Sequence, residues 1–394
     1  MRIAFYHNLP SGGALRVTEK QVSELCKSHE IDCFRLSSAS DASQTLDGCF
    51  NNVNVYGYHL EAPHRHGRLQ PIAWLRDLRR MASVSKTIGA DIDSGSYDVC
   101  LTVTCPYFEM PFLHSHVSVP TLYLCHSSTY PSLQTLRPDR PPRTAATRNP
   151  FARRFDRELA AHKLESARRA NMIAANSLFS REELFRLYGV NSYLLYPAVD
   201  TGLFHPEPGI ARERAILGVG ALAPFKAHDL SVRAAGRIPY PSRPELWIVY
   251  HTALEGEKEY LVHLAQALGV SLKLIADISP DELRELYNRA AVTVFPSIFE
   301  PLGLVPLESM ACGTPVVGVA EGGTRETVTN GVTGLLTNRD ADAFAEAIST
   351  LLDKPDYAVE MGKAGLASIR EKWTWERSIA DLEKLLAKVV SMAR

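Results

Sequence analysis

The sequence predicts an α/β protein built from two doubly wound, mostly parallel sheets. Short apolar strands alternate with helical stretches along most of the chain, which is the pattern of strands joined by crossover helices. The 394 residues are too many for a single core and suit two domains of ordinary size. A segment with two prolines and a glycine, 203–214, indicates the linker between the two domains.

The composition argues against several classes of protein. With 45% apolar and 22% charged residues, the chain is typical of soluble globular proteins, and its net charge of −1 gives no electrostatic reason to expect nucleic acid. The seven cysteines are odd in number and include no C-x-x-C pair, so they predict free thiols in a reducing cytosol. The chain begins with a strand pattern and lacks an apolar run long enough to span a bilayer, which predicts a cytoplasmic protein.

The first half opens with a strand at 2–6, a loop at 7–13 and a helix with apolar residues on one face. Ligands of such sheets bind outside the carboxyl ends of the strands, where Gly12 and Gly13 would let backbone approach a ligand. His126 would occupy another such strand end. Position alone favours an ordinary turn for the glycines and a structural role for the histidine. Further strands are predicted at 31–36, 53–58, 98–103, 121–124, 172–175 and 193–196.

The second half contains a run, 218–223, with the glycine spacing of a dinucleotide-binding fingerprint. That interpretation needs an acidic residue at the end of the next strand, but the strand predicted at 246–250 ends in His251. Pro224 also interrupts the helix that should follow, so a dehydrogenase is not predicted. Further predicted elements are a strand at 316–319 and three helices after Gly331.

The most informative segment is 297–317. It follows an apolar, β-branched run at 291–295 that is typical of a strand buried on both faces. Pro296 and Pro301 forbid regular structure between this strand and a helix predicted at 303–312. The free N–H groups of that helix would lie at the carboxyl edge of the sheet, where they suit a phosphate.

Two carboxylates flank the predicted phosphate site. Glu300 lies in the loop and Glu308 lies in the helix, eight positions later. Carboxylates do not help to bind a diphosphate, so we expect them to accept hydrogen bonds from neutral hydroxyl groups. A phosphate flanked by two diols describes a nucleotide sugar. The alternative is that both glutamates are solvated charges around an ordinary βα unit.

This segment resembles the E-x7-E signature of the retaining glycosyltransferases of family 4, also called group 1. The resemblance implies the GT-B fold, in which two Rossmann-like, doubly wound domains face each other across a cleft. An acceptor-binding domain would cover 1–204 and be completed by the C-terminal helix 375–394, and a nucleotide-sugar-binding domain would cover 205–374. The matching positions are Glu300, Pro301, Gly303, Leu307, Glu308, Met310, Ala311, Gly313, Pro315 and Val316, followed by Gly322, Gly323 and Glu326.

The resemblance implies a role for each of four residues in and beside this helix. Glu300 would hold the hydroxyls of the donor sugar, and Glu308 would hold the ribose. Backbone N–H groups at Gly303 and Leu304 would meet the diphosphate.

Other donor contacts are implied earlier in the same half. Gly220 would start a phosphate-binding loop, and Lys226 would reach the diphosphate as a compact point charge. Ala221 stands where the family often has an arginine, so one usual diphosphate contact is missing. Backbone near Ile278 would read the edge of the nucleobase.

In the first half, the resemblance implies that Gly12 and Gly13 face the donor phosphates or the acceptor, and that His126 contacts the donor sugar. The implied catalytic set is His126, Lys226 and Glu300. Catalysis would be electrostatic, with Lys226 and the helix N-terminus stabilising the departing diphosphate.

We predict no cofactor, because the nucleotide sugar is a co-substrate. We also predict that no metal is required. The D-x-D triplets at 91–93 and 340–342 are interpreted as structural, and the His-Arg-His run at 64–66 as surface. Two basic segments, 65–80 and 137–169, favour either solvated surface or a peripheral contact with an anionic membrane or an anionic acceptor.

Together these observations predict a metal-independent, retaining hexosyltransferase. It would move a hexose-type sugar from a UDP- or GDP-sugar to a hydroxyl acceptor, in the synthesis of a polysaccharide, glycolipid or other glycoconjugate. A nucleotide-sugar epimerase of the same architecture and a catalytically silent nucleotide-sugar-binding subunit remain as alternatives. A phosphorylase would need a lysine that carries pyridoxal phosphate, and nothing marks one.

Overall fold

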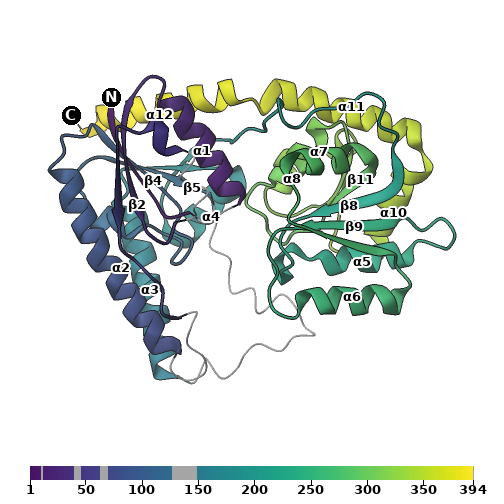
Figure 1. Ribbon diagram of the computed structural model, residues 1–394, viewed down its shortest axis with the longest axis horizontal. Coiled ribbons are helices and arrows are strands. Elements are labelled where there is room, and N and C mark those ends of the chain that lie inside the picture. The colour runs from purple at the N-terminus through teal and green to yellow at the C-terminus, as the bar shows by residue number, and fades with distance from the viewer. Residues whose placement is uncertain (10–11, 40–45, 63–69, 127–148, 394) are drawn as a thin grey trace. The chain divides into compact units, whose positions relative to one another are not determined.

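The computed structural model describes residues 1–9, 12–39, 46–62, 70–126 and 149–393. The chain divides into two compact units (Figure 1). The first unit contains residues 1–196 and 378–394, and the second contains residues 197–377. The described residues hold no helix that is both long and apolar enough to traverse a lipid bilayer.

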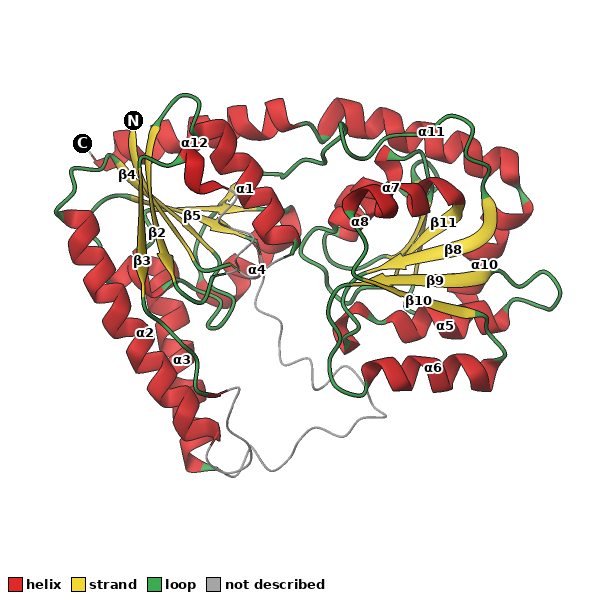
Figure 2. Ribbon diagram, viewed as in Figure 1, coloured by secondary structure: helices red, strands yellow, loops and turns green. Residues whose placement is uncertain are grey.

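The first unit has a seven-stranded parallel sheet in the order β3-β2-β1-β4-β5-β6-β7. Its strands are drawn in yellow in Figure 2. This order reverses between β1 and β4, as doubly wound sheets do. The strands are β1 (Arg2–His7), β2 (Glu30–Leu36), β3 (Asn52–Tyr56), β4 (Val99–Val103), β5 (Thr121–Cys125), β6 (Met172–Ala175) and β7 (Tyr193–Leu194).

Helices cover both faces of this sheet. One core cluster joins β1 and β4 to the apolar faces of α1 and α12, and another joins them to α2 and a 3-10 helix, η4. The helices are α1 (Gly13–Leu25), α2 (Gln70–Asp93), η4 (Phe112–Ser115), α3 (Pro150–Arg169), α4 (Leu178–Tyr188) and α12 (Trp375–Ala393).

The second unit has a six-stranded parallel sheet in the order β10-β9-β8-β11-β12-β13. Its order reverses between β8 and β11, so a ligand is expected beyond the carboxyl ends of these two strands. The strands are β8 (Glu213–Val219), β9 (Glu245–Tyr250), β10 (Leu272–Ala276), β11 (Ala290–Phe295), β12 (Val316–Val319) and β13 (Gly334–Thr337).

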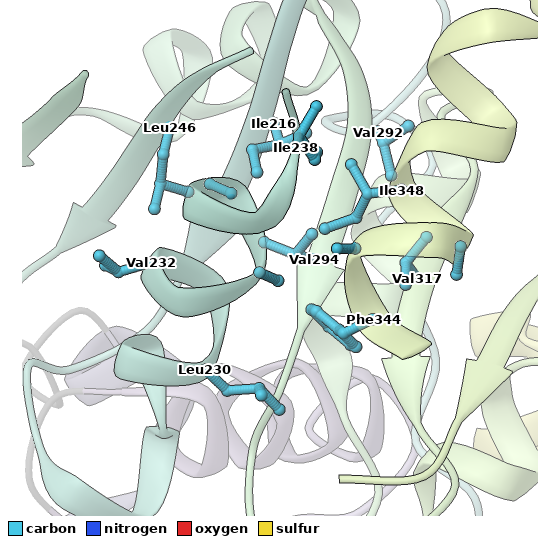
Figure 3. Close-up of a cluster of buried hydrophobic side chains, with 14 of the residues drawn as sticks. Ile216, Leu230, Val232, Ile238, Leu246, Val292, Val294, Val317, Phe344 and Ile348 are labelled. Atoms are coloured by element: carbon cyan, nitrogen blue, oxygen red, sulfur yellow. The ribbon is translucent and has the colours of Figure 1, made fainter. Parts of the chain in front are cut away.

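Apolar side chains from the strands and from four helices form the core of the second unit. Val292, Val294 and Val317 of the sheet belong to one cluster with Leu230 of α5 and Phe344 of α10 (Figure 3). The helices are η7 (Pro224–Lys226), α5 (His228–Arg237), α6 (Glu257–Leu268), α7 (Pro280–Arg289), α8 (Leu304–Ala311), α9 (Thr324–Thr327), α10 (Ala341–Asp353) and α11 (Pro355–Lys372).

Most predicted elements are present, but two predictions need correction. The prediction of three helices directly after Gly331 missed β13, which has only four residues and forms the edge of the sheet. The predicted linker 203–214 is packed into the second unit, because Glu207 binds the side chains of Arg284 at 2.6 Å and Asn288 at 2.9 Å. The chain therefore passes between the units near residues 196–197 and 377–378, where the sequence predicted 204–205 and 374–375.

Candidate active site

Two loops meet at the carboxyl ends of β8 and β11 in the second unit. The first loop follows β8 and contains η7, and the second connects β11 to α8. The Ile298 N–H donates a hydrogen bond of 2.8 Å to the Phe225 carbonyl and so joins the two loops. The reversal of strand order therefore brings residues that are far apart in the sequence into one place.

Lys226 and Glu300 form an ion pair across these loops. Lys226 Nζ lies 2.6 Å from Glu300 Oε2, and each side chain is 20% exposed. The apolar stem of Lys226 lies over Gly220, where an added Cβ would be 3.4 Å from Lys226 Cδ. Gly220 has a φ of 150°, which disfavours any other residue there. The structure thus brings three predicted donor residues together.

The backbone around Glu300 is fixed by a pair of glycines before α9. The Gly323 N–H donates to the Glu300 carbonyl at 2.8 Å. A Cβ on Gly322 would overlap the Glu300 backbone, and one on Gly323 would overlap the backbone at Pro301. Phe299 has a positive φ of 45°, which is unfavourable for an aromatic residue. The loop therefore holds Glu300 in a defined and locally strained conformation.

The N-terminus of α8 lies at the end of the same loop. Gly303 occupies the N-cap position with a φ of 99°, and no side chain caps the helix. The first turn contains no acidic residue. Its N–H groups and the positive end of the helix dipole therefore suit an anion. The diphosphate contact of Gly303 and Leu304 at this helix N-terminus stays a prediction.

Glu308 lies in the second turn of α8 and is buried, with 4% of its surface exposed. The Tyr287 hydroxyl of α7 donates a hydrogen bond of 2.9 Å to Glu308 Oε2. Burial of a carboxylate requires such donors. Tyr287 was not predicted from the sequence, because it lies 21 positions before Glu308 and on a different helix.

The turn predicted to read the nucleobase follows β10. Its backbone is tied to the neighbouring strand β9, because the Asp277 N–H donates to the Tyr250 carbonyl at 3.2 Å. Ser279 and Glu282 form a capping box at the start of α7. Ile278 lies between these two anchored positions, with its backbone at the carboxyl edge of the sheet.

A further residue that sequence reasoning missed, Arg339, braces the loop before Glu300. Its guanidinium donates to the carbonyls of Pro296 at 2.7 Å and Ser297 at 3.0 Å, and it also pairs with Glu321 at 2.7 Å. The guanidinium is therefore already bound to carbonyl and carboxylate groups of the protein. Arg339 therefore positions the loop and does not replace the arginine that is missing at Ala221.

In the first unit, the predicted residues lie around α1. Gly12 is the N-cap of α1 with a φ of 145°, and Gly13 begins the helix. His126 follows β5, and its Nε2 lies 3.0 Å from Thr18 Oγ1 of α1. The His126 N–H donates to Thr104 Oγ1 at 2.9 Å. Burial lowers the pKa of His126 to about 4, so the imidazole is neutral at pH 7.

The residues considered as metal ligands have structural partners. Asp340 caps the N-terminus of α10 by accepting bonds from the N–H groups of Asp342 and Ala343. Asp91 accepts a bond from the Tyr56 hydroxyl, and Asp93 accepts one from the Ser118 N–H. In the described part of the chain, no group of three or more metal-ligating side chains is close enough to hold a metal ion. The run 64–66 lies outside the described residues.

Residues 203–367 match the family model described as "Glycosyl transferases group 1". The matched residues lie within the second unit and make up most of it. The match contains every donor residue that the sequence predicted in this unit, from Gly220 to Glu308.

Several curated relatives are about one third identical to this chain over about half of its length. The D-inositol 3-phosphate glycosyltransferase of Thermobispora bispora is 32% identical over 244 residues, which are 56% of this chain and 56% of that protein. The protein of the same name from Kribbella flavida is 35% identical over 220 residues, which are 50% and 52% of the two chains. The chain thus spans about half the length of the curated relatives it matches.

Solved structures resemble the whole chain. The structure of Anabaena Alr3699/HepE in complex with UDP and glucose has a TM-score of 0.73 at 20% identity, and covers 98% of this chain and 100% of that one. Sucrose-phosphate synthase from Thermosynechococcus elongatus has a TM-score of 0.78 at 21% identity, with 99% of each chain covered. At this level of identity the likeness shows the fold, which is the GT-B architecture of two Rossmann-like units.

Proposed function

We propose that this protein is a metal-independent, retaining glycosyltransferase that moves a hexose-type sugar from a UDP- or GDP-sugar to a hydroxyl acceptor. The observation that carries the proposal is the Lys226–Glu300 ion pair, which lies between the end of β8 and the uncapped N-terminus of α8. A cation and a helix N-terminus suit a diphosphate, and a carboxylate beside them suits sugar hydroxyls.

Donor binding would exchange the partners of this ion pair. The diphosphate would take the Lys226 ammonium and the N–H groups of α8, and hydroxyls of the sugar would then donate to Glu300. Each charge keeps a partner, which avoids the cost of a partly buried, unpaired carboxylate. A nucleoside diphosphate without sugar would bind Lys226 but would offer no hydroxyl groups to Glu300, which would lose its ion pair without a replacement. The exchange therefore favours the intact donor over the product.

The nucleoside would lie against α8 and the end of β10. Glu308 would accept hydrogen bonds from the ribose with Tyr287 as its supporting donor, and backbone near Ile278 would contact the base. The buried Tyr287–Glu308 bond fixes the position of the carboxylate before any ligand arrives.

The chemical step would rest on stabilisation of the leaving group. Lys226 and the N-terminus of α8 would stabilise the negative charge that grows on the diphosphate. The leaving phosphate would take the proton of the acceptor hydroxyl, and the acceptor would attack the face of the sugar that the diphosphate leaves, which retains the configuration. His126 would hold a sugar hydroxyl as a neutral imidazole, in keeping with its pKa of about 4.

The first unit would bind the acceptor. The name of the curated relatives makes D-inositol 3-phosphate one acceptor to test, together with simple sugars and glycolipids. We also propose a peripheral contact between the first unit and the anionic inner surface of a membrane. Among the described residues, this proposal is supported by exposed arginines of α2 and α3 and by the exposed Phe151. Arg79 and Arg154 are paired with Glu158, whereas Arg76, Arg153 and Arg157 are also exposed. Residues 65–69 and 137–148 of the predicted basic segments lie outside the described residues.

The deciding experiment incubates purified protein with labelled UDP- and GDP-sugars, with EDTA, and with or without a panel of acceptors and cell extract. Transfer of label to an acceptor with retained configuration supports the proposal. Isomerisation of the donor without transfer would identify an epimerase, and tight binding without turnover would identify a silent subunit. A strict requirement for Mg²⁺ would contradict metal independence. Sedimentation with vesicles that contain anionic lipid tests the membrane contact.

A further inference from the structure

Two cysteines from separate elements lie side by side in the first unit. Cys26 is the C-cap residue of α1, and Cys49 ends the short turn 46–49 that precedes β3. Their Sγ atoms are 2.8 Å apart. A covalent S–S bond is about 2.05 Å long, so formation of the bond would shorten this gap by less than ~1 Å.

The pair differs from the remaining thiols in its access to solvent. Cys26 and Cys49 are only partly buried, whereas the other cysteines are buried. A dissolved oxidant can therefore reach this pair in the folded protein. The buried thiols are Cys33, Cys100, Cys105, Cys125 and Cys312.

We propose that Cys26 and Cys49 are an oxidation site, at which a low-molecular-weight disulfide such as oxidised glutathione produces a reversible intramolecular disulfide. In the first step, the thiolate of Cys49 attacks one sulfur of oxidised glutathione and releases one glutathione thiolate. In the second step, Cys26 loses its proton, attacks the Sγ of Cys49 and releases the second glutathione. The protein loses two hydrogen atoms, and one glutathione disulfide becomes two thiols.

The environment of Cys26 gives the order of these steps. Burial, and then the neighbouring Cys49 thiol, raise the pKa of Cys26. Cys26 is therefore a poor first nucleophile, because only the thiolate attacks a disulfide. It becomes effective once Cys49 carries the leaving glutathione, since the two sulfurs are then held together by the fold.

The turn that carries Cys49 is already fixed against the sheet. Asp47 accepts bonds of 2.6 and 2.9 Å from the guanidinium of Arg35 in β2, and Leu46 and Phe50 pack against the core around β1. Oxidation would therefore join two elements that are in place and would need little movement. The bond would close a loop between positions 23 apart in the sequence. Such a crosslink stabilises a protein mainly by restricting the unfolded chain.

The test treats the full chain with oxidised glutathione, alkylates the remaining thiols and digests with trypsin. Cleavage after Lys20, Lys27 and Arg35 places Cys26, Cys33 and Cys49 in three different peptides. We expect peptide 21–27 to be linked to the peptide that begins at residue 36, and a dithiol reductant to separate them. The proposal is overturned if all seven cysteines are alkylated after oxidation, or if the link involves peptide 28–35.

Two single variants test the order of the steps. Cys26→Ser should accumulate a glutathione adduct on Cys49, because the second attack is impossible. Cys49→Ser should remain largely unmodified at Cys26 under the same conditions. Equal adducts on both variants would contradict the order, and a disulfide between two cysteines of the protein in either variant would contradict the pairing.

A thermal measurement tests the effect on the fold. Oxidation should raise the melting temperature of the wild-type protein by about 3–10 °C, as expected for a loop of this length. The double variant with serine at both positions should melt at the same temperature with and without oxidant. An equal rise in the double variant would show that the oxidant acts elsewhere.

Discussion

Lys226 and Glu300 are 74 positions apart in the sequence, yet their side-chain charges are in contact at 2.6 Å. Each residue neutralises the other while no ligand is bound. The ion pair therefore determines which chemical groups a ligand needs in order to displace it. An incoming molecule has to offer negative charge to the ammonium and hydroxyl donors to the carboxylate.

Replacement of Lys226 by Gln should remove the cation from the diphosphate site. We expect kcat/KM with the active donor to fall by about 10²–10³-fold, in line with the loss of one charge-stabilising group. Affinity for the nucleoside diphosphate should fall as well, which calorimetry can measure. Lys258→Gln on the exposed face of α6 is the matched control and should leave both quantities unchanged. Wild-type rates in Lys226→Gln would remove this residue from the site.

Replacement of Glu300 by Gln should separate binding of product from turnover. The variant frees Lys226 from its ion pair, so UDP or GDP should bind as tightly as in the wild type or up to about tenfold more tightly, the equivalent of ~1.4 kcal/mol. Turnover should nevertheless fall by about 10²-fold or more, because the neutral amide has one accepting oxygen in place of two and makes no charge-assisted hydrogen bond to the sugar. Glu255→Gln, at an exposed position, is the control. Weaker binding of the diphosphate to Glu300→Gln would contradict the exchange of partners.

Gly322 and Gly331 offer a matched pair of substitutions by alanine. Both glycines have positive φ values, of 55° and 76°, but only Gly322 lies against the backbone of Glu300. Gly331→Ala should cost only about 1 kcal/mol in the free energy of unfolding, from its backbone conformation. Gly322→Ala should cost more and should also lower kcat/KM, because the Glu300 loop has to move. Equal kinetic effects of the two variants would mean that the glycine contact does not position Glu300.

Tyr287→Phe tests the buried contact with Glu308. The variant removes one donor from a buried carboxylate, which should lower the free energy of unfolding by about 1–3 kcal/mol. Affinity for nucleoside diphosphates should fall while affinity for inorganic diphosphate stays constant, because only the ribose contact is disturbed. Denaturant unfolding and calorimetry measure the two effects. Loss of inorganic diphosphate binding would show that the change spreads to the N-terminus of α8.

The first unit should lose stability in mild acid. Burial is the largest cause that lowers the pKa values of His7, His114, His126 and His162, each to about 4 from a usual value of 6.5. Between these two values the unfolded chain binds more protons than the folded one, so the free energy of unfolding falls as pH falls from 6.5 to 4. Thermal unfolding between pH 7.5 and 4.5 should show this fall. A melting temperature that does not change over this range would contradict the burial of these neutral histidines.

Much of the fold could be predicted from the sequence because each sheet is buried on both faces. Strands such as 291–295 are then continuous apolar runs, and Gly303 and Pro315 mark the limits of the next helix. The edge strand β13 escaped prediction because it is short and only partly buried. Candidate site residues such as Glu300 could be named from the sequence because they belong to a recognisable local sequence pattern. Tyr287 and Arg339 have none, since their importance comes from contacts that only the folded chain creates.

Helix α12 follows the second unit in the sequence but packs against the sheet of the first unit, which affects how the chain folds during synthesis. Leu382, Leu385, Leu386 and Val389 are buried in the core beside β1, although the whole second unit separates them from that strand in the sequence. The ribosome must therefore release residues 382–389 before the interior of the first unit can close. Until then, an apolar surface next to β1 stays open to chaperones, while the second unit, already complete, is free to fold.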